Sequence, residues 1–163
     1  MLTTVTLAIT MMFAQAIIPT DQKKLTPSKS EVLASIERFM ANPGPGEDAI
    51  AINKFAEDSK DCLVSVTPNV LTWMNHQPPY KYAGAFFTAF IAGNIKSQLD
   101  SGKVADDSHA GLLSVFKVYD TIRARDKEFK ASEIDELIAK EKAGELKAWI
   151  AKAQEDEKKA EGK

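Results

Sequence analysis

One uncharged stretch constrains the fold more than any other feature of this chain. Residues 82–99 carry no charged side chain before Lys96, and their large side chains are mostly phenylalanine and isoleucine. These side chains recur on one face at helical spacing, while the opposite face carries alanine and glycine in place of polar residues. A helix that is apolar nearly all round must be enclosed by other elements. The stretch therefore predicts the central helix, at about 82–100, of a packed bundle.

The same stretch is too short to cross a membrane. Its uncharged run ends at Ile95, whereas a spanning helix needs roughly 20 predominantly apolar residues. The spacing of Ala85, Ala89 and Gly93 resembles the small-residue contacts of membrane helix pairs. Small residues at this spacing serve close packing in a soluble bundle equally well, so we expect no membrane span in the mature chain.

Apolar residues also repeat at helical spacing on both sides of this stretch. Two prolines and two glycines at 43–46 end the first of these helices, and Gly144 divides or bends the last. In the helix that starts near Glu47, Ile50 and Phe55 belong to the predicted buried stripe. The fold is therefore predicted to be all-α, a single-domain helical bundle of five to seven helices.

The first 18 residues form a segment that is separate from the predicted bundle. They carry no charged side chain, and Ala14-Gln15-Ala16 has the small-x-small form of a signal-peptidase site. The usual lysine or arginine near the start is absent, and a retained N-terminal anchor is the alternative. Pro19 and the charged residues after it close the apolar run. We expect a signal peptide at 1–16 and export, to the periplasm or as a secreted protein, after cleavage near Ala16.

The remaining residues divide into three parts. Residues 17–27 are predicted to be a flexible leader, 28–153 the helical domain, and 154–163 a disordered charged tail without a large apolar residue. Within the domain, the join at 101–108 is short enough to require antiparallel neighbours. The two helices that it connects are therefore expected to form the central pair.

The run Cys62-Leu63-Val64-Ser65-Val66 is short and rich in β-branched residues. A lone strand leaves its backbone groups without partners, and no second strand is evident. We therefore expect this run to be the buried end of the second helix or a further helical turn. Cys62 is the only cysteine, which allows no internal disulfide. We expect it to be a small buried side chain whose pKa is raised by the nearby acids Asp58 and Asp61.

Composition and motifs exclude some partners and chemistries. A formal net charge of −2 without a basic block argues against nucleic acid. His76 and His109 are the only histidines, and neither has a metal-ligating residue three or four positions further on. We therefore expect no metal and no cofactor. The sequence has no nucleophile elbow and no phosphate-binding loop. A catalytic site of Cys62 with the two histidines can be drawn, but any chain with one cysteine and two histidines allows this, so the pattern is almost no evidence for an enzyme.

The stretch 73–82 is the most suggestive of binding. It places aromatic side chains beside the stiff Pro78-Pro79 loop, and amphipathic aromatics on a rigid loop make good contact surfaces. The alternative is that Trp73 and Tyr82 complete the core while the two prolines turn the chain. The candidate binding surface consists of Trp73, His76, Tyr80, Lys81 and Tyr82.

Three functions are compatible with these features. The first is an exported, non-enzymatic helical module that binds a protein or peptide through an exposed apolar or aromatic patch. The second is an enzyme in which a histidine approaches a carboxylate or Cys62. The third is a small-ligand carrier with a cavity beside Phe86, Phe90 and Asn94. Asn94 and Gln98 either line such a pocket or mark where the central helix leaves the core.

Overall fold

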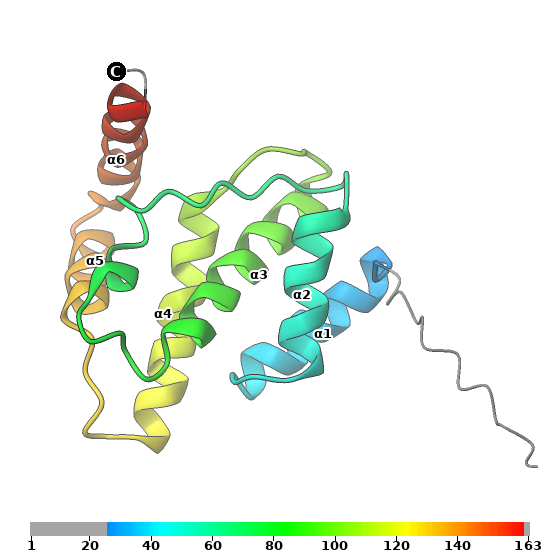
Figure 1. Cartoon of the computed structure of the whole chain (residues 1–163), viewed down its shortest axis with the longest axis horizontal. Coiled ribbons are helices and arrows are strands. Elements are labelled where there is room, and N and C mark those ends of the chain that lie inside the picture. Colours follow the sequence, from blue (N-terminus) through cyan, green and yellow to red (C-terminus); the bar gives the residue numbers. More distant parts are fainter. Residues whose placement is uncertain (1–25, 162–163) are drawn as a thin grey trace, which may run out of the picture.

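The computed structural model describes residues 26–161 (Figure 1). They form six α-helices and one short 3₁₀-helix, and no strand occurs within this range. The predicted all-α bundle of five to seven helices is confirmed. The predicted signal peptide and the leader as far as residue 25 lie outside the described residues. The elements are α1 (Lys29–Ala41), α2 (Glu47–Asp58), η1 (Thr72–Asn75), α3 (Ala83–Ser101), α4 (Ser108–Arg125), α5 (Ser132–Lys142) and α6 (Leu146–Glu161).

α3 is the enclosed helix of the bundle, as its apolar sequence predicts. Ten of its residues are buried, and α1, α2 and α4 all pack against it. α4 runs antiparallel to α3, because Phe86 contacts Tyr119 near one end and Asn94 contacts Asp106 near the other. Gly102 ends α3 in the left-handed conformation (φ 67°), which glycine adopts without steric cost. No helix in the described part of the chain has the length and apolarity of a membrane span.

Two glycines let α3 and α4 approach closely. A Cβ atom at Gly111 would lie 2.6 Å from a ring carbon of Phe90, and one at Gly93 would meet the carbonyl oxygen of Ala110. Phe90 and Asn94 are fully buried. The space beside Phe90 on the α4 side is therefore filled by protein, and it offers no support for the carrier hypothesis.

α1 and α2 form a hairpin that packs on α3. α1 begins with a capping box between Ser28 and Glu31, which satisfies backbone N–H groups that have no partner within the helix. In α2, Ile52 and Phe55 are buried, whereas Ile50 is 52 % exposed. Our assignment of Ile50 to the buried stripe was wrong. Ile52 lies three residues before Phe55 and therefore shares its helical face, whereas Ile50 lies on a different face.

The chain between α2 and η1 contains no regular helix or strand. α2 ends at Asp58, and Ser59 is already extended (φ −82°, ψ 143°). The prediction that helix continues through Cys62 to Val66 was therefore wrong. Cys62 itself is buried, at 7 % exposure, as expected for a small apolar side chain. Burial raises the pKa of the Cys62 thiol, and the charge of Asp61 raises it further.

Side chains from α3 and from the α3–α4 connection form hydrogen bonds with the backbone groups of this segment. The Gln98 amide donates to the carbonyl oxygen of Leu63 (2.8 Å) and accepts from its N–H (2.9 Å). Oδ1 of Asp106 accepts from the N–H of Ser65 (2.7 Å) and from the Asn94 amide (2.8 Å). Asn94 and Gln98 are 0 % and 2 % exposed. Their hydrogen bonds fasten the loop at 63–65 and the α3–α4 connection to the core. We predicted that Asn94 and Gln98 would line a pocket or mark where the helix leaves the core, and neither prediction was correct.

α5 and α6 lie on the opposite side of the α3–α4 pair from α1 and α2 (Figure 1). Gly144 (φ 73°) separates these two helices, which is one of the two outcomes predicted for it. α6 continues through residues 154–161, where we predicted a disordered tail. Gln154 hydrogen-bonds to α4 (3.1 Å), and Glu155 and Lys159 form an ion pair one helical turn apart. These contacts, together with a sequence of strong helix formers, account for the longer helix.

Candidate functional site

The structure divides the candidate binding surface between the core and the rim. Trp73 is fully buried, in agreement with the alternative that it completes the core. Tyr80 and Tyr82 are half-buried, and each makes an edge-on contact with Phe129, at 5.8 and 4.9 Å between ring centres. Phe129 is the only aromatic residue of the charged connector after α4, and it packs in turn on Phe86. The aromatic stretch is therefore fastened to the core through Phe129.

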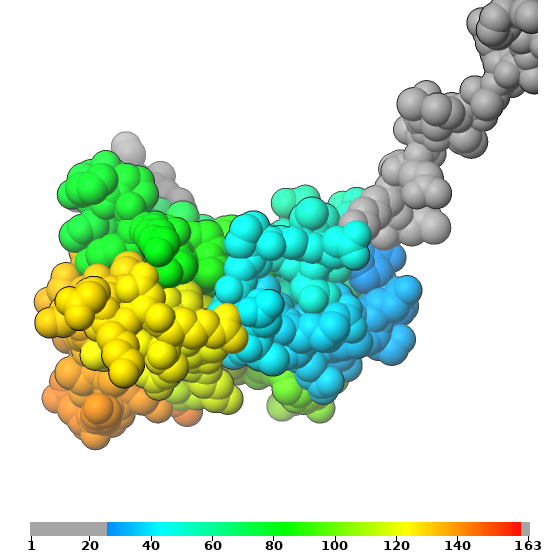
Figure 2. Space-filling model, turned by 90° about the horizontal axis from the view of Figure 1, so that it is seen from below, coloured from blue at the N-terminus to red at the C-terminus, as the bar shows by residue number. Residues whose placement is uncertain are grey.

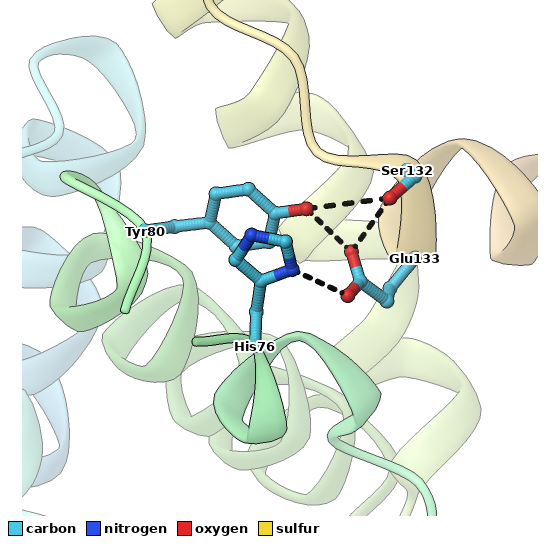
Figure 3. Close-up of polar contacts among 4 residues, drawn as sticks. All are labelled: His76, Tyr80, Ser132 and Glu133. Carbon is cyan, nitrogen blue, oxygen red and sulfur yellow. Dashed lines mark hydrogen bonds and ion pairs between the residues drawn. The ribbon is translucent and has the colours of Figure 1, made fainter. Parts of the chain in front are cut away.

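Figure 3 shows a polar cluster in which Glu133 is the common acceptor. The Tyr80 hydroxyl donates to Oε2 of Glu133 (2.5 Å), and the Ser132 hydroxyl donates to the same oxygen (3.1 Å). Nδ1 of His76 lies 2.9 Å from Oε1. The rings of His76 and Tyr80 are stacked, with their centres 4.0 Å apart. The cluster joins the loop after η1 to the first turn of α5.

The order of contacts in this cluster does not match that of a nucleophilic triad. A triad needs the histidine between hydroxyl and carboxylate, so that the ring takes the proton of the nucleophile. Here the carboxylate lies between Ser132 and His76. Partial burial raises the pKa of Glu133, but the hydrogen bonds that it accepts, with Tyr80 first, lower this pKa to about 2. An ionised carboxylate of this kind serves as a fixed anchor and is poorly suited to proton transfer near neutral pH.

We expect Glu133→Gln to lower the free energy of unfolding by about 2 kcal/mol at pH 7, because hydrogen bonds to a charged acceptor are lost. The folded-state pKa of Glu133 lies below its unfolded value of about 4.3. The contribution of its charge is therefore full above pH 4.3 and is lost as the pH falls towards 2. Urea unfolding of both proteins should show a difference at pH 7 that shrinks at about pH 3. A difference independent of pH would contradict this account of the cluster.

The other residues of the enzyme hypothesis lie in separate contacts. Nε2 of His109 is 3.0 Å from Oε2 of Glu141, and this contact joins α4 to α5. Sγ of Cys62 contacts the carbonyl oxygen of Phe55 (3.9 Å), and no contact joins it to a histidine among residues 26–161. The same range contains no group of three or more histidine, cysteine or acidic side chains able to hold a metal ion. Each histidine therefore approaches a carboxylate, and within residues 26–161 neither contacts the Cys62 thiol.

Lys81 and Tyr82 also form one side of an apolar groove. The groove has a volume of about 630 Å³ and lies between the α1–α2 connection, α2 and the first turns of α3. Figure 2 shows the surface hollowed between the green segment that leads into α3 and the cyan α1–α2 connection. Its main apolar lining residues are Pro43, Pro45, Ile50, Tyr82, Ala85 and Phe87.

Two local features keep this groove open. The Pro43-Gly44-Pro45-Gly46 connection cannot continue the helix before it, so the chain bends at that point. On α3, Gly84 has nothing within 4 Å of the position where a Cβ atom would lie. The rim is held by Asp126, which accepts from the Tyr82 hydroxyl (2.8 Å) and pairs with Lys81 (3.3 Å). These two contacts lower the pKa of Asp126.

Sequence reasoning identified only two residues of the groove, Lys81 and Tyr82. It assigned Ile50 to a buried stripe and placed Ala85 and Phe87 on an enclosed helix. A signal was present in α2, where Ile50-Ala51-Ile52 offers more consecutive apolar residues than one buried face accommodates. The groove itself could not be read from the sequence, because the residues that line it come from segments about forty positions apart.

The fold and the groove define a small helical module with a concave apolar site between α2 and α3. Comparisons with protein-family models, with curated proteins and with solved structures found no match. The chemistry of the groove lining is therefore the basis for a function.

Proposed function

We propose that this chain is an exported, non-enzymatic helical module that binds an apolar peptide segment of another protein in the groove between α2 and α3. The groove itself is the observation that supports the proposal. Its volume of about 630 Å³ lies in the range of ligand sites, and its lining is mostly apolar. Ile50 adds an aliphatic side chain that is 52 % exposed. Covering this side chain with a partner removes apolar surface from water, which favours association.

The polar groups of the lining define the ligand further. Lys81 is the only charged residue of the lining, and 70 % of its side chain is exposed. A carboxylate on the peptide, from an acidic side chain or from a chain end, is attracted to it. Asn53 donates to the carbonyl oxygen of Ala49 (2.9 Å), which fixes the orientation of its amide. Its Oδ1 is buried without a hydrogen-bond partner in the described chain, and it is not exposed to the groove.

The export part of the proposal rests on the uncharged residues 1–18 and on Ala14-Gln15-Ala16. Mass spectrometry of the exported fraction is expected to find a chain that begins at Ile17. A chain that stays in the cytosol and keeps Met1 would contradict it.

Ile50→Asp is expected to weaken peptide binding at least about tenfold, because it removes an apolar contact and places an anion in the groove. The probe is a peptide selected against the chain from a phage-displayed random library, with its affinity measured by calorimetry. Val104→Asp is the matched control, since Val104 is 56 % exposed and does not line the groove. We expect the selected peptides to be apolar with an acidic residue near one end.

Two results would overturn this function. One is a library that yields no binder. The other is a set of selected binders in which none loses affinity on Ile50→Asp.

A further inference from the structure

The backbone groups along one edge of the extended segment 62–66 are hydrogen-bonded in the pattern of a β-strand. We call this the occupied edge. Leu63 pairs both its N–H and its C=O with the Gln98 amide, as it would with a residue of a neighbouring strand. Ser65, two residues further on, donates its N–H to Asp106. In a strand, the backbone groups of alternate residues point to the same edge. Side chains of the bundle therefore take the place of one neighbouring strand.

The opposite edge of this segment is free. Cys62 is buried, at 7 % exposure, so only Val64 and Val66 direct accessible backbone groups to it. None of their N–H or C=O groups has a hydrogen-bond partner in the part of the chain that the structure describes. A row of unpaired N–H and C=O groups is a template for a further strand, and β-branched residues suit that conformation. Figure 1 shows the segment crossing one end of the bundle from α2 towards α6, with no strand beside it.

We propose that this free edge binds an extended segment of another polypeptide as an added β-strand. The side chains of Gln98 and Asp106 already hold the segment in place, so little order has to be gained on binding. Main-chain hydrogen bonds provide the attraction in this mode of recognition, and alternate side chains provide the selectivity. Val64 and Val66 face the partner, which corresponds to a partner segment of about three residues.

The exposed side chains favour a short peptide over a second copy of this chain. On the segment itself, only Leu63 and Val66 are large and exposed, at 55 % and 50 %. They supply a small part of the roughly 1,200–2,000 Å² that stable protein interfaces bury. An added peptide strand depends on main-chain hydrogen bonds and needs less area. Leu63 favours aliphatic or β-branched side chains at alternate positions of the partner.

The hollow beside the segment lies on its occupied edge, because Asp106, the acceptor of the Ser65 N–H, lines it. This hollow of about 380 Å³ lies next to Ser65, Val66 and Thr67, and α6 forms its other side. Lys158 and Glu157 line that side. This hollow therefore does not receive the partner strand.

Val66→Pro tests this edge directly, because it removes an N–H that has no partner within the described residues. The probe is a set of short random peptides displayed on phage and selected against the full chain. We expect Val66→Pro to weaken the selected peptides at least about tenfold, since it removes one main-chain hydrogen bond and obstructs its neighbours. Val66→Thr keeps the N–H and the β-branch and is expected to keep binding. Urea unfolding checks that Val66→Pro remains folded.

Ile50→Asp separates this inference from the proposed function. It alters the groove and leaves the edge intact, so peptides that add as a strand should bind it with unchanged affinity. Peptides that lose affinity for Ile50→Asp but keep their affinity for Val66→Pro bind in the groove, and they do not support binding at the 62–66 edge.

Amide hydrogen exchange gives a readout that needs no variant. Binding should slow exchange at Val64 and Val66, while Leu63 and Ser65, already hydrogen-bonded to side chains, keep their rates. Selection of no such peptide, or binding that leaves the Val64 and Val66 rates unchanged, would overturn the inference. Concentration-dependent dimers that Val66→Pro abolishes would also overturn it, because the occupant would then be a second copy.

Discussion

Gly93→Ala is expected to lower the free energy of unfolding by about 3 kcal/mol, the upper part of the range for overpacked cores. A methyl group at this position would meet the carbonyl oxygen of Ala110 and the side chain of Ser114, whose Cβ lies 2.7 Å away. The carbonyl belongs to the backbone of α4, so relief requires the two helices to separate. Urea unfolding followed by circular dichroism measures the change.

Gly84→Ala is the matched control for this prediction. Both glycines lie in α3, but Gly84 has nothing within 4 Å of the added methyl group. Its replacement is expected to leave stability unchanged or to raise it by up to about 1 kcal/mol through helix propensity. If the two variants were equally stable, the close contact between α3 and α4 would be incorrect.

The second large effect is expected at Asp106. Asp106→Ala leaves the Asn94 amide, the N–H of Ser65 and the Ser108 hydroxyl without their acceptor. Asn94 is fully buried, so its amide loses a partner inside the core. We expect a loss of about 3 kcal/mol, because each buried donor left unpaired costs roughly 1–3 kcal/mol. Thermal and urea unfolding both report this loss.

Asp100→Ala is the appropriate comparison for Asp106→Ala. Asp100 is an acid whose side chain is 56 % exposed and pairs with Lys96 one helical turn away. Removing an exposed pair of this kind changes stability by about 0.5 kcal/mol or less. Equal effects of the two substitutions would mean that Asp106 is not the acceptor that joins the two loops.

Local patterns in the sequence were sufficient to predict the helical core. The apolar stretch around Phe86 and Phe90 identified α3 and its approximate end. The prolines and glycines at 43–46 identified the end of α1. Each of these features depends on residues close together in the chain, where spacing carries the physical information.

Predictions failed where the partner of a segment is distant in the chain. The run 62–66 has strand-like residues, and its hydrogen-bond partners are side chains at Gln98 and Asp106, which no strand pattern identifies. The aromatic stretch could be located, but its division between the core and the rim depends on Phe129, which lies in a charged connector. The groove likewise exists only once Pro43 and Ala85 lie side by side.

The two proposed surfaces have different physical requirements. The groove depends on covering apolar surface around Ile50, whereas the 62–66 edge depends on main-chain hydrogen bonds. Binding to the groove is therefore expected to tolerate backbone N-methylation of the peptide at most positions. Binding at the edge is expected to be lost when alternate amides of the peptide are methylated.

Chemical-shift mapping by NMR, with a selected peptide whose binding Ile50→Asp weakens, tests the central claim most directly. The account predicts that the amide signals that move belong to Ala49, Ile50, Asn53, Ala85 and Thr88, the residues around the groove between α2 and α3. Shifts confined to α5 and α6, or no shifts at peptide concentrations that saturate binding, would contradict it.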